Sequence, residues 1–131
     1  YSLNSNMKST IEIPNAPSPV GPYSQAIKYN GLTIASGQIA IDPKTGILNT
    51  SSIEKETIQI LKNIDALLDA GNLKRDNILK CSIFLKDMND FKKVNEIYGS
   101  FFKEPYPSRE TVEVARLPKD ANIEISFIAG E

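Results

Sequence analysis

The chain has 131 residues, 40% of them hydrophobic and 24% charged, with 15 basic side chains against 16 acidic ones. This length predicts one domain, and the near-neutral charge does not favour nucleic acid as a partner. With no histidine and one cysteine, Cys81, the chain excludes an intrachain disulfide, histidine-ligated metals and every nucleophile system that uses histidine as its base.

The N-terminal segment is polar. Residues 1–6 have no apolar run, which excludes a signal peptide, and no apolar stretch of the chain is long enough to span a membrane. We expect residues 1–9 to be a flexible extension or a cloning remnant, and residues 10–131 to be a single domain. The native start is then Met7, or a site left by removal of a leader. A reducing, cytoplasmic location is expected, with import into an organelle left open.

An irregular segment and a strand follow. Four prolines within residues 14–22 predict extended, irregular chain. Residues 32–41 are apolar and β-branched, which predicts a buried strand, and Ser36-Gly37 within them predicts a bulge or a close approach of backbone. Residues 42–46 predict a turn.

The next element is a helix. Ser51 and Glu54 have the spacing of a capping box, and apolar residues recur at helical spacing from Ile53 to Leu68. Gly71 is expected to end this helix in the left-handed conformation.

Residues 79–86 alternate between apolar and polar side chains, which predicts a strand. Cys81 lies on its apolar side and is expected to be an inert core thiol. A second helix over residues 91–102, capped by Asn89 or Asp90, presents an apolar face.

Two closing strands are predicted at residues 110–115 and 122–129. The connection between them is short, so we expect them to pair as neighbours. The element order predicts an α+β fold of two layers, with one mixed sheet and both helices packed on one of its faces. The other face is too apolar for water, so oligomerisation through it is expected.

Two charged residues near the C-terminus are candidates for chemistry. Arg109 stands where a proline-containing loop enters a strand, and its planar fork suits bidentate binding of a carboxylate. Glu124 faces away from Ile123 and Ile125 on its strand. Residue types alone also allow a surface arginine and a solvated glutamate.

Four motifs occur in the order and spacing of a known family, from about residue 11 to residue 129. They are Gly21-Pro-Tyr23-Ser-Gln25, Ser36-Gly-Gln38-Ile, Lys86-Asp87-Met-Asn-Asp-Phe91, and Pro107-Ser-Arg109 with Val112-Glu-Val-Ala-Arg-Leu-Pro118 and Ile123-Glu124-Ile. On these motifs the chain resembles the Rid (YjgF) family, in its RidA branch.

The resemblance implies a homotrimer of chorismate-mutase-like α+β subunits, with a pocket at each subunit interface. Such proteins hydrolyse reactive 2-imino acids, 2-iminobutanoate and 2-iminopropanoate, to 2-oxo acids and ammonia without a metal or organic cofactor. It implies that Arg109 anchors the substrate carboxylate and that Glu124 orients or deprotonates the attacking water.

The remaining pocket residues are also implied by the resemblance. Tyr23 would close one wall, and Ser36 and Gly37 would present backbone groups to the substrate. Thr111 replaces a residue that is cysteine in some relatives, so it can hydrogen-bond a substrate but not act as a thiol. Glu110 either pairs with Arg109 or faces away from it, as strand alternation predicts.

Two alternative functions remain open. The first is an endoribonuclease that inhibits translation, for which a basic patch of Lys74, Arg75, Lys92 and Lys93 would be needed; the missing histidine and the net charge argue against it. The second is a trimer that binds 2-oxo acids without turnover. It would keep Arg109 and need no activated water.

Overall fold

The computed structural model describes residues 7–14, 19 and 21–131. Residues 1–6 of the expected N-terminal extension lie outside the described residues, as do residues 15–18 and 20 of the irregular segment. None of the helices in the described ranges is both long and apolar enough to cross a membrane.

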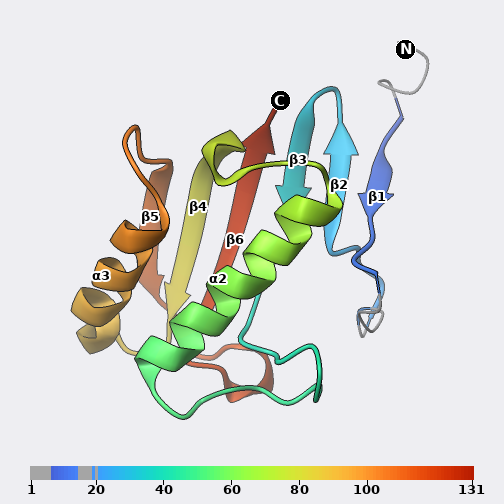
Figure 1. Ribbon diagram of the computed structural model, residues 1–131. Helices are drawn as coiled ribbons and strands as arrows, with labels where there is room; N and C mark the ends of the chain where they lie inside the picture. The colour runs from blue at the N-terminus through green and yellow to red at the C-terminus, as the bar shows by residue number, and fades with distance from the viewer. Residues whose placement is uncertain (1–6, 15–18, 20) are drawn as a thin grey trace.

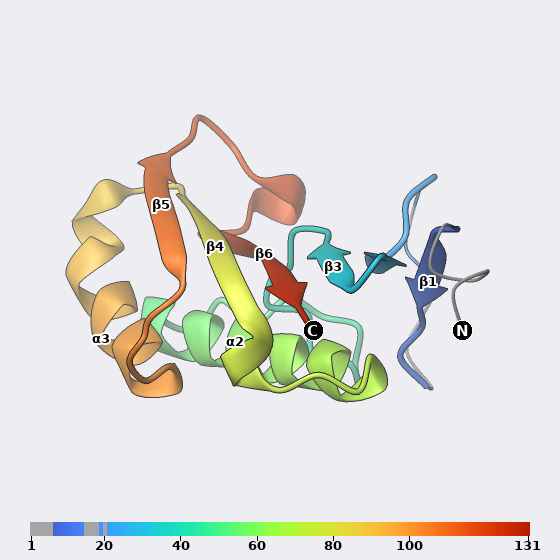
Figure 2. The same ribbon diagram turned by 90° about the horizontal axis from the view of Figure 1, so that it is seen from above.

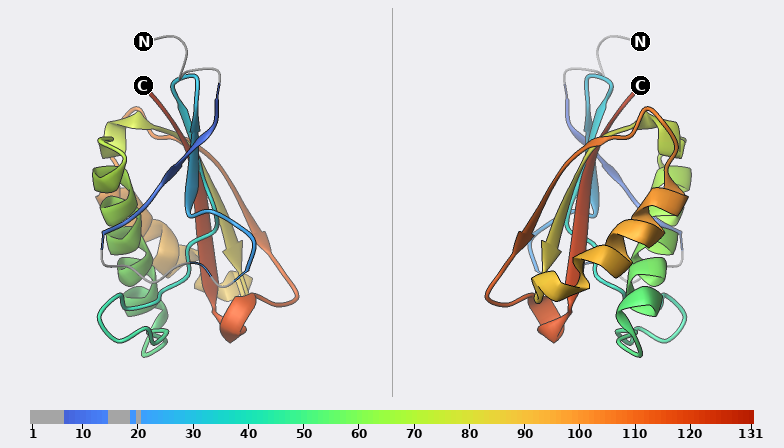
Figure 3. Two further views of the ribbon diagram at one scale, coloured as in Figure 1. Left: turned by 90° about the vertical axis from the view of Figure 1, so that its right-hand side faces the viewer. Right: turned by 90° about the vertical axis from the view of Figure 1, so that its left-hand side faces the viewer.

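The described residues form two layers, with one mixed sheet covered on one face by two helices (Figures 1, 2 and 3). This confirms the predicted α+β fold. The sheet order is β1-β2-β3-β6-β4-β5, in which only β4 and β5 pair in parallel. The strands are β1 (Ser9–Ile11), β2 (Ala26–Tyr29), β3 (Leu32–Ala35), β4 (Ile78–Leu85), β5 (Ser108–Glu113) and β6 (Ile123–Gly130), and the helices are α2 (Ile53–Ala70) and α3 (Phe91–Phe101).

The predicted pairing of the two closing strands is wrong. β4 lies between β5 and β6, because the β4-α3-β5 crossover carries β5 to the outer side of β4 while β6 returns between β3 and β4. The strand predicted over residues 32–41 is too long: β3 ends at Ala35, and beyond it only isolated bridges continue, from Gln38 to Ile125 and from Ile41 to Leu48. The turn predicted after it is confirmed, since the Gly46 amide donates to the Asp42 carbonyl at 2.8 Å.

The ends of α2 differ from the prediction at both termini. The N-cap is Ser52, not Ser51, and its hydroxyl accepts a hydrogen bond from the Lys55 amide at 3.0 Å. Gly71 ends the helix with an ordinary φ of −93°, and the left-handed residue is Asn72 with φ 57°. Gly71 also lies close to β1: a Cβ there would be 2.7 Å from Ile11 Cδ1, so the Ile11 side chain would have to move to admit a larger residue.

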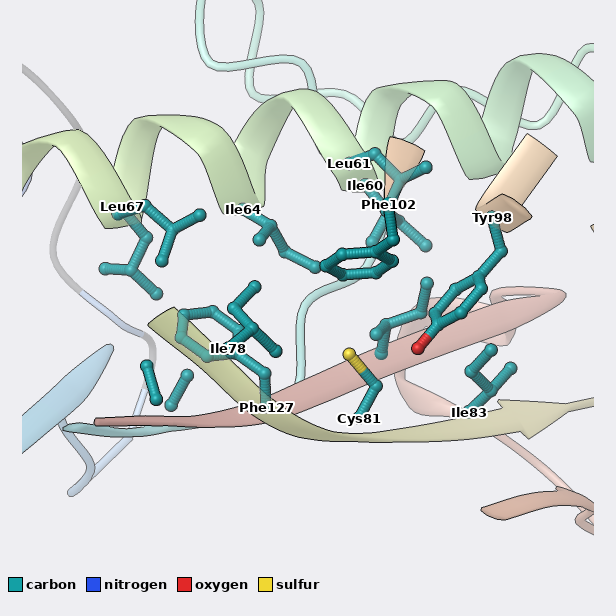
Figure 4. Close-up of a cluster of buried hydrophobic side chains, with 14 of the residues drawn as sticks. Ile60, Leu61, Ile64, Leu67, Ile78, Cys81, Ile83, Tyr98, Phe102 and Phe127 are labelled. Atoms are coloured by element: carbon teal, nitrogen blue, oxygen red, sulfur yellow. The ribbon is translucent and has the colours of Figure 1, made fainter. Parts of the chain in front are cut away.

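The core lies between the helices and the sheet (Figure 4). Ile60, Ile64 and Leu67 of α2 are fully buried against β4 and β6. Cys81 is 1% exposed, which confirms the expected core thiol. Leu79 was expected beside it in the core but is 52% exposed, because a register shift between Ile78 and Lys80 turns Leu79 outward and buries Ile78 instead.

The face of the sheet opposite the helices is left open within one chain (Figures 2 and 3). It exposes apolar side chains on three strands: Leu32 and Ile34 of β3, Leu79 of β4 and Val112 of β5 are between 41% and 52% exposed. Apolar side chains on three strands of one sheet face are an unusual surface to leave in water. We call this surface the open face.

Candidate functional site

Glu124 lies on the open face, next to a glycine that leaves room for its side chain. Its strand pairs with the segment after β3 through the Gln38 amide and the Ile125 carbonyl at 2.8 Å, and through the Ile125 amide and the Gln38 carbonyl at 3.0 Å. A Cβ on Gly37 would lie 2.5 Å from both Cδ and Oε2 of Glu124. Gly37 is therefore needed for the close approach of the Glu124 carboxyl, which is the close backbone approach predicted from Ser36-Gly37.

Ser36 and Tyr23 lie in the same region. The Ser36 hydroxyl donates to the Ser24 carbonyl at 2.6 Å, and the Ser36 amide donates to the Gln25 carbonyl at 2.9 Å. These bonds hold residues 23–25 beside residues 36–38. The Tyr23 side chain is 52% exposed and follows a tight turn, in which its amide donates to the Gly21 carbonyl at 2.9 Å. Tyr23 is thus free to contact a ligand.

Arg109 lies in β5, on the side of the sheet that carries the helices. Its guanidinium donates to Asn95 Oδ1 of α3 at 2.8 Å. The same group lies 4.8 Å from the centroid of the Tyr98 ring and 5.6 Å from that of Phe91. It forms no ion pair with any described residue. An arginine held by neutral partners keeps its charge available for an anionic ligand.

Two residues that follow Arg109 on β5, Glu110 and Thr111, have different surroundings. Glu110 faces the open face, where it pairs with Lys80 at 3.1 Å and accepts a hydrogen bond from the Ser82 hydroxyl. It therefore does not compete for Arg109, as the alternation predicts. Thr111 faces the same way as Arg109, and its buried Oγ1 has no hydrogen-bond partner among the described residues. A buried hydroxyl without a partner costs about 1–3 kcal/mol, so a ligand that bonded it would recover this cost.

Arg109 and Glu124 lie on opposite faces of the sheet. Arg109 is in register with Cys81 on the helix side, and Glu124 is in register with Phe84 on the open side. Since side chains alternate along a strand, one copy of the chain presents two separate groups, Arg109 with Thr111 and Glu124 with Tyr23, Ser36 and Gly37. One chain does not bring the predicted site residues together.

Partial burial raises the pKa of the Glu124 carboxyl above its ordinary value of 4.5. Because the folded-state pKa is the higher one, Glu124 favours folding at acid pH, and this contribution is lost as pH rises through the raised pKa. Glu124→Gln is therefore expected to unfold at a higher temperature than the wild type at pH 7. The difference should vanish below pH 4.5, as checked by thermal unfolding from pH 3.5 to 8.

Glu110→Gln provides a control of opposite sign, since Ser82 and Lys80 lower the pKa of the Glu110 carboxyl. This variant should be less stable than the wild type at pH 7. Identical pH profiles for wild type and Glu124→Gln would contradict the prediction for Glu124.

Sequence reasoning missed the partners of Arg109 on α3. The predicted apolar face of this helix includes Phe91 and Tyr98, but not Asn95, which lies four residues after Phe91 and three before Tyr98. A polar residue on that face was the available signal, because it predicts a polar partner on the sheet.

The comparisons with known proteins agree along nearly the whole chain. A family model described as endoribonuclease L-PSP matches residues 13–131. A RutC family protein of Pyrococcus horikoshii is 50% identical over 123 residues, which are 94% of this chain and 98% of that protein. The 2-iminobutanoate/2-iminopropanoate deaminase of Salmonella typhimurium is 45% identical over 126 residues, covering 94% of this chain and 98% of the deaminase.

The fold agrees as well. A crystal structure of a protein of unknown function of the Rid family, from Yersinia pestis, matches with a TM-score of 0.91 at 52% identity and covers 95% of this chain and 100% of that one.

Proposed function

Because the chain belongs to the Rid family, which the L-PSP model describes, we propose that it hydrolyses 2-imino acids to 2-oxo acids and ammonia. The substrate class is 2-iminobutanoate and 2-iminopropanoate. The observation that carries this proposal is Arg109, a charged group held against α3 without an ion pair to any described residue. A 2-imino acid offers such a group a carboxylate, which it binds through two charge-assisted hydrogen bonds.

Besides this carboxylate anchor, imine hydrolysis needs a water molecule and a group that orients it or accepts its proton. With the carboxylate fixed on Arg109, the imine carbon takes up a defined position, and a water adds to it. Glu124 orients this water or accepts its proton, directly or through backbone carbonyls, and the raised pKa of its carboxyl makes it a better base near neutral pH. The proton that the water loses passes to the imine nitrogen, which gives a tetrahedral adduct with a hydroxyl and an amino group. The carbon–nitrogen bond of this adduct then breaks as the hydroxyl proton moves to the nitrogen, which leaves as ammonia, and the carbon becomes the carbonyl of the 2-oxo acid.

The proposal includes a homotrimer whose sites lie between copies of the chain. Arg109 with Thr111 on one copy would meet Glu124, Tyr23, Ser36 and Gly37 on the next, because one copy presents these groups on opposite faces. The open face supports this assembly, since its exposed apolar side chains gain by being covered.

Ile34→Glu tests the assembly. Ile34 is 50% exposed on the open face, so the charge should leave the fold intact and dissociate the copies. We expect light scattering to give about three times 14.5 kDa for the wild type and a mass close to one chain for the variant. Ile58→Glu is the matched control, because Ile58 is 42% exposed on α2 and should keep the wild-type mass. A wild-type mass near one chain would refute the trimer.

The activity is tested by ammonia release from 2-iminobutanoate generated in situ by a threonine dehydratase. A rate above spontaneous hydrolysis supports the deaminase, and equal rates with and without the protein refute it. Glu124→Gln separates the deaminase from a trimer that binds 2-oxo acids without turnover, because only the deaminase loses a reaction in this variant.

The basic side chains give the endoribonuclease alternative less support than Arg109 gives the deaminase. Of the four residues that could form a basic patch, Arg75 forms an ion pair with Asp65 at 2.7 Å and lies 3.8 Å from the centroid of the Phe101 ring. A genuine ribonuclease site would bind RNA with an affinity that falls steeply as salt rises. RNA binding whose affinity does not fall as salt rises would count against the endoribonuclease.

A further inference from the structure

The guanidinium of Arg109 has three partners on one face of α3, and they differ in how firmly they are held. Asn95 is exposed and Phe91 is 37% exposed, whereas Tyr98 is 4% exposed. Tyr98 also lies nearer to the guanidinium than Phe91 does, at 4.8 Å against 5.6 Å from the ring centroid. Tyr98 is therefore the most buried of the three side chains that Arg109 contacts.

The Tyr98 ring is held from two sides. Phe102 packs against the ring with centroids 4.8 Å apart. The hydroxyl of Tyr98 is buried and directed at Cys81 on β4 (Figure 4). Burial, with the neighbouring thiol, raises the pKa of the Tyr98 hydroxyl, so it stays neutral. The Tyr98 ring therefore contacts both the hydrophobic core and the Arg109 guanidinium at the edge of the sheet.

A long arginine side chain on an edge strand loses conformational freedom when a ligand fixes it. A ring that already holds the guanidinium reduces this loss before the ligand arrives. The attraction between the guanidinium cation and the ring face adds to the same effect.

We infer that Tyr98 is a positioning residue of the proposed deaminase, whose ring face holds the Arg109 guanidinium ready for the substrate carboxylate. The inference rests on the proposed function. It assigns a role to the ring of Tyr98 and none to its hydroxyl.

Three variants at Tyr98 test this role through KM and kcat for 2-iminobutanoate. Tyr98→Leu removes the ring and should raise KM about five- to tenfold with a smaller change in kcat. Tyr98→Phe keeps the ring and should keep KM near the wild-type value. Tyr98→Met, with an unbranched side chain that fills the same space, takes the place of Tyr98→Leu if that variant does not fold.

Phe127→Leu is the matched control for core damage. Phe127 is 2% exposed in the same hydrophobic cluster, and among the described residues its ring stacks on neither Tyr98 nor Arg109. We expect this variant to lower the unfolding temperature but leave KM unchanged. A rise in KM equal to that of Tyr98→Leu would overturn the inference, because general loosening of the core would then explain both.

The double variant Tyr98→Leu/Arg109→Ala decides whether Tyr98 acts through Arg109. If it does, removing the ring changes KM no further once the guanidinium is gone. A further rise in the double variant, or a wild-type KM in Tyr98→Leu and Tyr98→Met, refutes the role of Tyr98. If instead Arg109→Ala alone leaves KM unchanged, the proposed function itself fails, so the two failures are distinguished.

Discussion

Arg109→Ala is expected to raise KM for 2-iminobutanoate about a hundredfold or more, because the loss of a charged partner for a bound carboxylate costs about 2–5 kcal/mol. Arg109→Lys should recover only part of this loss, since an ammonium group cannot form the two parallel hydrogen bonds of a guanidinium. Steady-state ammonia release, with the imine generated in situ, measures both variants.

The control for this experiment is a second arginine that packs on an aromatic ring of α3. Arg75 lies 3.8 Å from the Phe101 centroid and bonds Asp65, but it is not among the residues of the proposed site. Arg75→Ala should keep the wild-type KM. If Arg75→Ala and Arg109→Ala change KM equally, Arg109 does not act as a specific anchor.

Gly37→Ala is expected to reduce kcat about a hundredfold with little change in KM. The new methyl group would lie 2.5 Å from Cδ and Oε2 of Glu124, so the carboxyl must leave its position. Loss of a positioned acid or base group typically costs a factor of 10²–10⁴ in rate. Glu124→Gln should give a loss of similar size, because it removes the basic oxygen without moving the side chain.

Gly99→Ala is the matched control for this substitution. Apart from its chain neighbours and the backbone of its own helix, no heavy atom of the described residues lies within 4 Å of the place its Cβ would take, and alanine is the better helix former at this position in α3. The variant should be slightly more stable than the wild type and equally active. A Gly37→Ala protein with the wild-type kcat would contradict the proposed role of Glu124.

The helices and the buried side of the sheet were predictable from local patterns. The periodicity between Ile53 and Leu68 and the spacing of Val94 and Tyr98 correctly predict which sides pack on the core. The β2–β3 hairpin was missed although Asn30-Gly31, with φ of 49° and 80°, is a strong turn signal.

Other features were beyond local reasoning. The order of β6, β4 and β5 depends on a crossover through α3, which sequence spacing does not reveal. The bulge that turns Leu79 outward likewise arises from pairing with β6.

The candidate site also combines features that local patterns predict with features that depend on how the strands pair. The motif pattern proposed the site residues one at a time, and strand alternation correctly predicted that Glu110 faces away from Arg109. The separation of Arg109 and Glu124 onto opposite faces could not be predicted, because it depends on the sheet register around β4.

This separation has a genetic consequence. In the proposed trimer, each site takes Arg109 from one copy and Glu124 from another, so two inactive variants carry complementary halves. If Arg109→Ala and Glu124→Gln chains are unfolded, mixed equally and refolded together, random assembly leaves about one site in four with both residues intact. Such intersubunit complementation would restore roughly a quarter of the activity. Sites contained within single chains would regain none.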